Sequence, residues 1–316
     1  MKSFTAGKNE QDVRLSRFVE SVTANLPQSL LYKSFRNKRV KVNGKRAAPD
    51  DRLAVGDVVE LYINDEFFTN VQAAKPMPKK PPKITVIYED ANIAALYKPA
   101  HLLCHGDHTG DASLVDGFIA YLAAKNEYQA DAEASFTPAI CNRLDRGTEG
   151  LVLAAKNYAA LRDMNEIIRT DLLCKEYYAI TCGAPPAGRH IAYLRHFEKD
   201  NKVLVQKHPA NGYKEIITDV AVLAVKGPLT LCKIGLITGR THQIRAHLAF
   251  LNAPVLGDIK YGNRKLNERY GVKTQALCAF SVTFKDIPRE NTLADLSKNC
   301  ICLENPEIEK LFKRLP

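Results

Sequence analysis

The chain has 316 residues, 46% of them hydrophobic, and carries a formal net charge of +10 at pH 7. This length and apolar content suffice for one large or two moderate cores. No apolar run approaches the roughly 18 residues of a membrane-spanning helix, and the polar amino terminus lacks a signal-peptide core, so we expect a cytoplasmic protein without a membrane partner. The excess of Lys and Arg predicts a polyanionic partner, but charge alone does not distinguish RNA from DNA or an acidic protein.

The sequence has no pattern typical of a metal or nucleotide cofactor site. Its cysteines occur without Cys-x-x-Cys pairs and are expected to be reduced thiols. His101, His105 and His108 lie in a Gly-containing loop without paired carboxylates, which makes a poor metal set. The sequence also lacks a P-loop and a dinucleotide-binding fingerprint. We therefore predict no metal and no cofactor.

The amino-terminal part predicts a polar tail and then a small α/β domain. Residues 1–10 are polar and are expected to be the tail, and residues 11–67 the domain. Within the domain, apolar spacing predicts an amphipathic helix that ends near Pro27. Ser29 is a suitable cap for a second helix.

A β-hairpin and a further strand should complete this domain. The Asn43-Gly44 pair between alternating residues is a strong hairpin pattern, and residues 58–63 read as a strand. Basic residues without intervening acidic ones are concentrated on the second helix and the hairpin, which is a footprint for phosphate, although an ordinary solvated face is the alternative. These residues are Lys33, Arg36, Lys38, Arg39, Lys41, Lys45 and Arg46.

Residues 68–83 are rich in Pro and Lys and predict a semi-rigid linker, so that a larger domain spans residues 84–316. We expect short strands and surface loops over 183–215, and a helix that begins near a cap at Thr241. The other expected elements are strands at 84–88, 93–97 and 151–156, helices around 114–122 and 161–168, a strand through Tyr177 and Tyr178 that turns them to opposite faces, two strands on either side of 226–228, and a terminal helix within 306–315.

The segment from Asn142 to Gly150 presents one carboxylate, Asp145, directly before an apolar strand. Arg143 and Arg146 flank Asp145 and would both favour its ionised form. An ionised Asp can act as a nucleophile or a general base. The alternative is an ion pair that only fixes a turn.

The motifs resemble those of the RluA-type pseudouridine synthases, in the same order. The run Arg143-Leu144-Asp145-Arg146 with Thr148 and Gly150 is similar to the segment that carries the family's catalytic Asp. Further matches are Lys175 to Ala179, Gly239 to Arg245, Pro254 to Asp258 with Tyr261-Gly262, and Gln275 to Leu277. The resemblance implies an α+β pseudouridine synthase fold, with a mixed, largely antiparallel sheet flanked by helices and a central cleft.

The resemblance also implies roles for individual residues. Asp145 would be catalytic, Tyr177 would pack against the base, and Leu277 would line the uracil pocket. Arg245 would pair with Asp145 in a bidentate contact, with Arg240 as a weaker candidate that could bind phosphate instead. Tyr177 is also one candidate base for the proton that leaves C5 of the uracil.

The chain departs from the family pattern at Asn142, Glu149, Ala253 and Cys278. The family commonly has His, Ser, His and His at these positions. Glu149 matters most, because a second carboxylate near Asp145 would raise the pKa of Asp145 unless it is solvated or paired.

The amino-terminal pattern of two helices, hairpin and strand resembles an S4-type RNA-binding domain. That domain ahead of this catalytic domain resembles synthases of large-subunit ribosomal RNA, so we expect ribosomal RNA as the substrate, with transfer RNA as the alternative. We expect a monomer. Two other functions remain open: an inactive RNA-binding or RNA-folding protein, and a hydrolase that uses Asp145 with Glu149 or Asp258.

Overall fold

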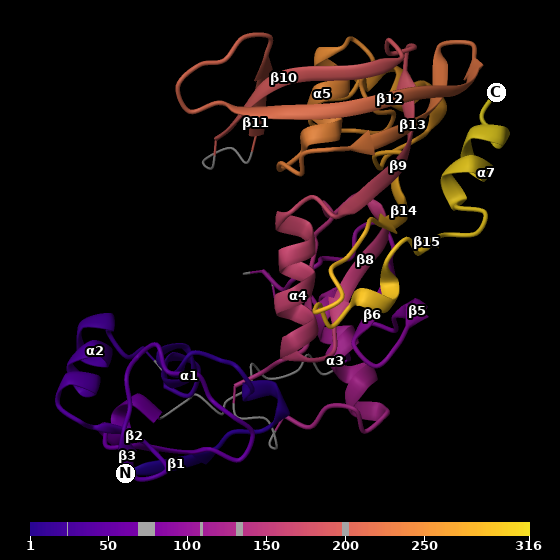
Figure 1. Ribbon diagram of the computed structural model, residues 1–316. Helices are drawn as coiled ribbons and strands as arrows, with labels where there is room; N and C mark the ends of the chain where they lie inside the picture. The colour runs from indigo at the N-terminus through magenta and orange to yellow at the C-terminus, as the bar shows by residue number, and fades with distance from the viewer. Residues whose placement is uncertain (24, 69–79, 108–109, 131–134, 198–201) are drawn as a thin grey trace.

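The computed structural model describes residues 1–23, 25–68, 80–107, 110–130, 135–197 and 202–316 (Figure 1). Most of the expected linker at 68–83, and His108, lie outside these residues. No helix in the described ranges combines the length and apolarity that a membrane crossing requires.

The amino-terminal unit is a four-stranded sheet in the order β1-β4-β2-β3, covered by two helices. Its core contains Leu15 and Phe18 from α1, Leu31 and Phe35 from α2, and Val59 from β4. Its elements are β1 (Lys2–Thr5), the 3-10 helix η1 (Lys8–Glu10), α1 (Leu15–Ser21), α2 (Gln28–Arg36), β2 (Val40–Val42), β3 (Lys45–Arg46), β4 (Val58–Leu61) and η2 (Asp65–Phe68).

Two expectations for this unit are wrong and one is confirmed. Residues 1–10 are not a tail, because β1 pairs along its whole length with β4. This pairing satisfies the hydrogen bonds of the backbone, and the polar side chains of the segment gave no sign of it. Ser29 is not a cap, since α2 begins one residue earlier with Pro27 at the N-cap. The hairpin turn is confirmed, because both Asn43 and Gly44 have the positive φ that a type I′ turn requires.

The larger part of the chain contains, within the described residues, one eleven-stranded sheet in the order β11-β10-β12-β13-β9-β14-β8-β6-β5, with β15 on β14 and β7 on β8. All its pairings are antiparallel except that of β14 with β8. The strands are β5 (Thr85–Glu89), β6 (Ile93–Lys98), β7 (Ala139–Ile140), β8 (Glu149–Ala155), β9 (Leu173–Cys182), β10 (Gly188–Phe197), β11 (Lys202–Gln206), β12 (Lys214–Lys226), β13 (Leu229–Leu236), β14 (Leu277–Phe284) and β15 (Cys300–Cys302). The predicted α+β class is confirmed.

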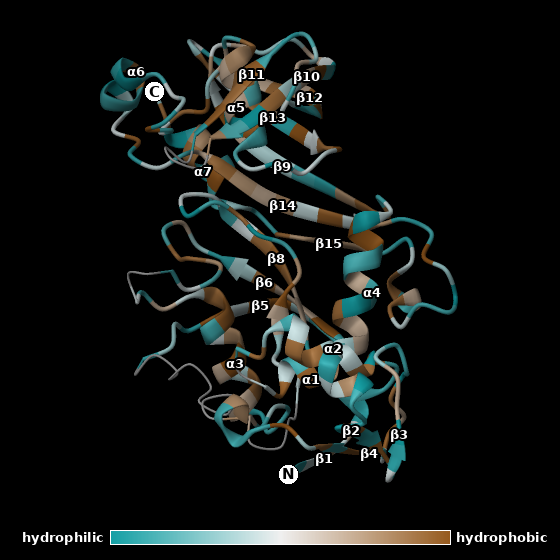
Figure 2. Ribbon diagram, turned by 90° about the vertical axis from the view of Figure 1, so that its left-hand side faces the viewer, coloured by the Kyte–Doolittle hydropathy of each residue, from teal (hydrophilic) through white to brown (hydrophobic). Residues whose placement is uncertain are grey.

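Helices cover both faces of this sheet because the central strands β6, β8 and β14 are buried at most successive residues, and therefore on both sides. The colouring of β14 in Figure 2 is accordingly mostly apolar. Residues of α3 and α5 share one core with Tyr177 and Leu277, whereas α4 packs on the opposite face of β6 and β8. The helices are α3 (Leu114–Ala124), α4 (Tyr158–Arg169), α5 (Gln243–Phe250), α6 (Arg264–Tyr270), the 3-10 helix η4 (Ala294–Leu296) and α7 (Glu307–Arg314).

The segment 183–215 was predicted as short strands and loops, but it contains the ten-residue strand β10 and its hairpin partner β11. Only one face of β10 is packed: Ala192 and Leu194 are buried, while Ile191, directly before Ala192, is 54% exposed. An apolar Ile on the exposed face removes the polar–apolar alternation by which a half-buried strand is recognised.

The amino-terminal unit contacts the larger part at α4 and at the segment after α3. Asn9 accepts a hydrogen bond from the backbone N–H of Tyr158 at 3.0 Å. Arg162 of α4 pairs with Asp12 at 3.0 Å, and Ser135 donates to Glu10. Figure 1 shows the amino-terminal unit beside one end of α4, with the carboxyl terminus at the far end of the molecule.

Candidate active site

Asp145 lies in the loop between β7 and β8, and its neighbours fix that loop. The buried Leu144 packs into the core, and its backbone N–H donates to Cys104 Sγ at 3.3 Å. The backbone N–H of Thr148 donates to the carbonyl of Asp145 at 3.0 Å and closes a turn. The carboxylate is therefore presented from a rigid base, with 27% of its side chain exposed.

The two glycines of the loop allow it to approach β14. A Cβ on Gly147 would lie 2.8 Å from the side-chain oxygen of Gln275, and a Cβ on Gly150 would collide with the backbone of Ala279. Gly150 also has φ +124°, which L side chains rarely adopt. These close approaches place the Asp145 loop beside the strand that carries Leu277.

Arg245 on α5 joins Asp145 to a second carboxylate. Its Nη1 donates to Asp145 Oδ2 at 2.6 Å, while Nε and Nη2 donate to the two oxygens of Asp258 at 2.6 and 3.1 Å. The predicted pairing of Arg245 with Asp145 is present. However, the predicted bidentate contact is made with Asp258, and Asp145 receives a single bond, which leaves its Oδ1 without a donor among the described residues.

Asp258 acts as the fixed anchor of this arrangement. Its side chain is 1% exposed, and its Oδ1 also accepts from the backbone N–H groups of Lys260 and Tyr261. Burial alone would raise the pKa of Asp258, but the hydrogen bonds and the charge of Arg245 outweigh it and lower the pKa. Because both oxygens are occupied, Asp258 cannot serve as the second carboxylate of a hydrolase with Asp145.

His242 approaches Asp145 from the start of α5. Its Nε2 lies 3.9 Å from Asp145 Oδ2, and its Nδ1 lies 3.0 Å from the hydroxyl of Tyr261. That hydroxyl already accepts from the backbone N–H of Val203, so its proton is directed to Nδ1. This pattern favours the tautomer that carries its proton on Nε2, facing Asp145.

The start of α5 also corrects an expectation. Thr241 is not the cap; His242 occupies that position with φ +54°. Gln243 braces the preceding turn instead, because its side chain accepts from the backbone N–H of Arg240 and from Thr238. Burial lowers the pKa of His242, although the charge of Asp145 opposes this effect.

Tyr177 and Leu277 lie on the adjacent strands β9 and β14, and both are buried. Burial, with the nearby charge of Asp145, raises the pKa of the Tyr177 phenol, which is therefore protonated near neutral pH. The next residue, Tyr178, stacks on Phe280 with ring centroids 3.8 Å apart, in the part of the molecule covered by α7. The prediction that the two tyrosines face opposite sides is thus confirmed.

Lys98 is a buried residue to which the sequence analysis gave no role. Its ammonium group donates to the carbonyl of Arg146 at 3.2 Å and to that of Pro99 at 3.0 Å. Burial lowers its pKa to about 8, while Cys104, Asp145 and Glu149 oppose the shift. Lys98 therefore holds the Asp145 loop in place through its hydrogen bond to the carbonyl of Arg146. A buried Lys cannot be recognised from a lone Lys-Pro pair.

The other arginines lie away from the carboxylate. Arg146 pairs with Asp111 at 3.2 Å rather than with Asp145. Arg143 and Arg240 are exposed, and neither makes an ion pair within the described ranges. The positive charge in contact with Asp145 is therefore that of Arg245, which is distant in sequence but 2.6 Å away, rather than that of either flanking arginine.

Glu149, the least expected departure from the family pattern, is partnered. Its carboxylate accepts from the Tyr97 hydroxyl at 3.0 Å. Burial raises the pKa of Glu149, and the bond from Tyr97 opposes that shift. Around these groups, and elsewhere in the described residues, no cluster of three or more His, Cys, Asp or Glu side chains is arranged to hold a metal ion.

The basic residues predicted to bind RNA all lie on the amino-terminal unit. Lys33 and Arg36 are on α2, Lys38 and Arg39 on the turn that follows, Lys41 on β2, and Lys45 and Arg46 on β3. Lys41 is partly buried and lies over the Tyr62 ring at 5.1 Å; the others are exposed. None of these residues forms an ion pair with another described residue, so their charges are available to an external anion.

Comparison with known proteins gives one class. Residues 92–250 match the profile of the RNA pseudouridylate synthase family. An uncharacterized RNA pseudouridine synthase of Mycoplasma capricolum is 33% identical, covering 97% of this chain and 98% of that protein. The ribosomal large subunit pseudouridine synthase C of Rickettsia bellii is 32% identical, covering 80% and 84%.

Among solved structures, the human RNA pseudouridylate synthase domain containing 4 has a similar fold, with a TM-score of 0.58 at 23% identity, covering 73% of this chain and 92% of that one. The chain belongs to the RNA pseudouridylate synthase family. It is an RNA pseudouridine synthase, an isomerase that modifies RNA, as its sequence motifs predicted.

Proposed function

We propose that Asp145 is the catalytic residue and that it acts on a uridine flipped out of structured RNA. The observation that carries this proposal is the bond from the buried Arg245 to one oxygen of a partly exposed Asp145. An arginine beside a carboxylate favours the ionised form and fixes its orientation. Asp145 is then both oriented and reachable.

The reaction breaks the bond between N1 of uracil and C1′ of the ribose and forms a bond from C5 to the same carbon. An ionised Asp145 can attack C1′, or it can remove the hydrogen at C2′, and both routes need the carboxylate in its charged form. In the first route C5 then attacks C1′ and displaces the Asp145 carboxylate; in the second, the proton returns to C2′ as C5 bonds to C1′. In either route the free base turns over, N1 gains a proton, and the proton on C5 leaves. Nothing is oxidised or reduced overall.

Tyr177 and Leu277 supply the apolar surroundings for the base. Both are buried on adjacent strands on the face of the sheet that also packs Leu144. Flipping the base out of the RNA costs a few kcal/mol in lost stacking and pairing, so the flipped base needs a surface that replaces the lost stacking. Because its pKa is raised, the Tyr177 hydroxyl is a weak candidate for the base that removes the C5 proton; we assign Tyr177 to packing.

The amino-terminal unit is the proposed RNA-binding domain, of the S4 type and spanning residues 11–67 together with β1, which completes its sheet. Its unpaired basic residues are suited to phosphates. Relatives described as ribosomal large subunit pseudouridine synthases align with 80% or more of this chain, which supports large-subunit ribosomal RNA as the substrate. Transfer RNA is the alternative, and the cytoplasm is the expected compartment.

The test is pseudouridine mapping of ribosomal and transfer RNA from cells that lack the gene, complemented with wild type or with Asp145→Asn. We expect one or more uridines in large-subunit ribosomal RNA to lose the modification and to regain it with wild type only. The Asn variant keeps the size of the side chain but lacks the charge, so activity should fall by at least about 10³-fold.

Asp111→Asn is the matched control, because Asp111 also faces an arginine of the same loop but is exposed. Equal recovery with Asp145→Asn would show that another residue is catalytic. A change confined to transfer RNA would overturn the ribosomal assignment while leaving Asp145 in place.

A further inference from the structure

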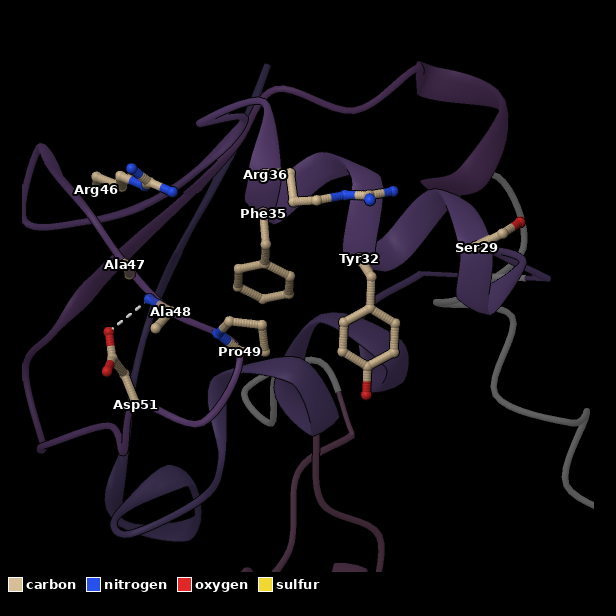
Figure 3. Close-up of a pocket in the computed structure, with 9 residues that line it drawn as sticks. All are labelled: Ser29, Tyr32, Phe35, Arg36, Arg46, Ala47, Ala48, Pro49 and Asp51. Carbon is tan, nitrogen blue, oxygen red and sulfur yellow. Dashed lines mark hydrogen bonds between the residues drawn. The ribbon is translucent and has the colours of Figure 1, made fainter.

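A pocket in the amino-terminal unit lies between α2 and the segment that follows β3. Its volume is about 630 Å³, within the range of roughly 300–1,000 Å³ that is typical of small-ligand sites. Figure 3 shows the residues around it: Ser29, Tyr32, Phe35, Arg36, Arg46, Ala47, Ala48, Pro49 and Asp51. None of them belongs to the Asp145 site.

Rings form the apolar part of this pocket. Phe35 is 3% exposed and belongs to the core of the unit, whereas Tyr32 is 49% exposed. In Figure 3 the rings of Tyr32 and Phe35 project from α2 in the same direction, toward the segment that carries Pro49. A half-exposed aromatic ring is a stacking surface for a planar group, and stacking of this kind accepts any base.

Charged groups surround the rings. Arg36 comes from α2 and Arg46 from β3, and Figure 3 draws them on either side of Phe35. Neither makes an ion pair with any described residue, so each can neutralise a phosphate without losing a protein partner. Asp51, whose Oδ2 accepts from the backbone N–H of Ala48 at 2.6 Å, supplies a carboxylate that can accept from a hydroxyl or amino group of a nucleotide.

We propose that this pocket binds one unstacked nucleotide of the RNA substrate, with its base on Tyr32 and the adjoining phosphates on Arg36 and Arg46. The proposal rests on the proposed function, since it takes the ligand to be the RNA that Asp145 modifies. An acidic peptide could satisfy the two arginines, but it would leave the flat, half-exposed ring of Tyr32 without a planar partner. The pocket would thus anchor an unpaired segment at a fixed position relative to the flipped uridine.

The experiment uses the full chain with Tyr32→Ala and Tyr32→Phe. Binding of an unstructured RNA oligonucleotide is measured by fluorescence anisotropy, and its contact is mapped by crosslinking of 4-thiouridine. Loss of one stacked base should weaken binding about tenfold in Tyr32→Ala and remove the crosslink to the peptide that contains Tyr32. Tyr32→Phe keeps the ring and should bind within about twofold of wild type.

Tyr62→Ala is the matched control, because Tyr62 is an exposed tyrosine of the same basic unit that does not line the pocket. Wild-type affinity in Tyr32→Ala, an equal loss in Tyr62→Ala, or equal displacement of the RNA by polyglutamate would each overturn the proposal. Pseudouridine formation by wild type is measured separately. Its absence, with RNA binding intact, would reject the proposed function and leave the pocket result readable.

Discussion

The molecule uses arginine in two opposite ways. In the larger part, Arg245 is 6% exposed and shared between Asp145 and Asp258. In the amino-terminal unit, Arg36 and Arg46 are exposed and have no acidic partner among the described residues. Arg245 is thus already paired with carboxylates of the protein, whereas Arg36 and Arg46 are available to the phosphates of the RNA.

The difference follows from the free energy required to bury a charge. A buried guanidinium must have its partners within the protein, because removal from water is opposed by several kcal/mol per ion. Its geometry is then fixed, as the role proposed for Asp145 requires. An exposed arginine keeps its water and gives up that geometry, which suits a phosphate that can be met from many directions.

After Asp145→Asn, the largest expected effect concerns Asp258, which positions Arg245 rather than touching the substrate. In Asp258→Asn, Arg245 loses its bidentate partner and is free to turn toward Asp145 and occupy both of its oxygens. We expect kcat to fall about 10²- to 10³-fold with little change in KM, because the interaction lost supports the reacting carboxylate rather than RNA binding. Removal of one partner of a buried pair should also destabilise the fold by roughly 3–5 kcal/mol.

Asp219→Asn is the control, since Asp219 forms the same two-bond contact with Arg189 at 2.8 Å on the surface. An exposed pair contributes about 1 kcal/mol at most, and kcat should be unaffected. If folded Asp258→Asn retained wild-type kcat, Asp258 would have only a structural role and the positioning argument would fail.

The sequence predicted which residues form the site, but not which of them pair with one another. Asp145, Tyr177, Arg245 and Leu277 were found because each lies in a recognisable motif. The bidentate partner of Arg245 was misassigned because Asp258 and Asp145 are both acidic residues in motifs, and only the fold decides which is buried. Arg146 was paired with Asp145 because the two are adjacent in sequence, yet its side chain points to Asp111.

The fold was predictable where local chemistry decides it. The Asn43-Gly44 turn depends on two residues that accept positive φ. The helix expected around 114–122 is α3, and the hydroxyl oxygen of its N-cap Ser113 accepts from the backbone N–H of Asp116. The strand β1 was missed because its order comes from pairing with β4, which lies more than 50 residues away. Pairing across such distances leaves no mark on the local sequence.

The second prediction is that acid weakens the larger part through His247, a fully buried residue of α5. Its Nδ1 lies 3.0 Å from the Thr218 hydroxyl, and its Nε2 has no partner among the described residues. Burial, with a smaller effect of His190, lowers the pKa of His247 from 6.5 to about 4. Between these values the unfolded chain binds a proton that the native protein does not, so stability is complete above pH 6.5 and falls as the pH drops toward 4.

A shift of this size corresponds to roughly 3 kcal/mol, to be measured as the free energy of unfolding in urea at several pH values. His247→Asn cannot titrate and should flatten the pH dependence in this range. His190→Asn, which alters a partly exposed ring 6.3 Å away, is the control and should keep most of it. An unchanged slope in His247→Asn would assign the acid sensitivity to another group.

The smallest effect is expected at the exposed arginines and should appear in the salt dependence of RNA binding. Each charge that neutralises a phosphate adds about 0.7–1 to the slope of log K against log salt concentration. Arg36→Gln and Arg46→Gln should each lower the slope by about that amount and weaken binding a few-fold near physiological salt, with kcat unchanged.

Arg264→Gln removes the same charge from α6, where the side chain is 91% exposed and paired with Glu268 at 2.8 Å, and it should leave the slope as it is. If all three substitutions lowered the slope equally, RNA would be responding to net charge rather than to this surface. If only Arg36→Gln and Arg46→Gln lowered the slope, these two exposed arginines would be the ones that bind phosphates. The contrast with Arg245, which is buried and paired with carboxylates of the protein, would then hold.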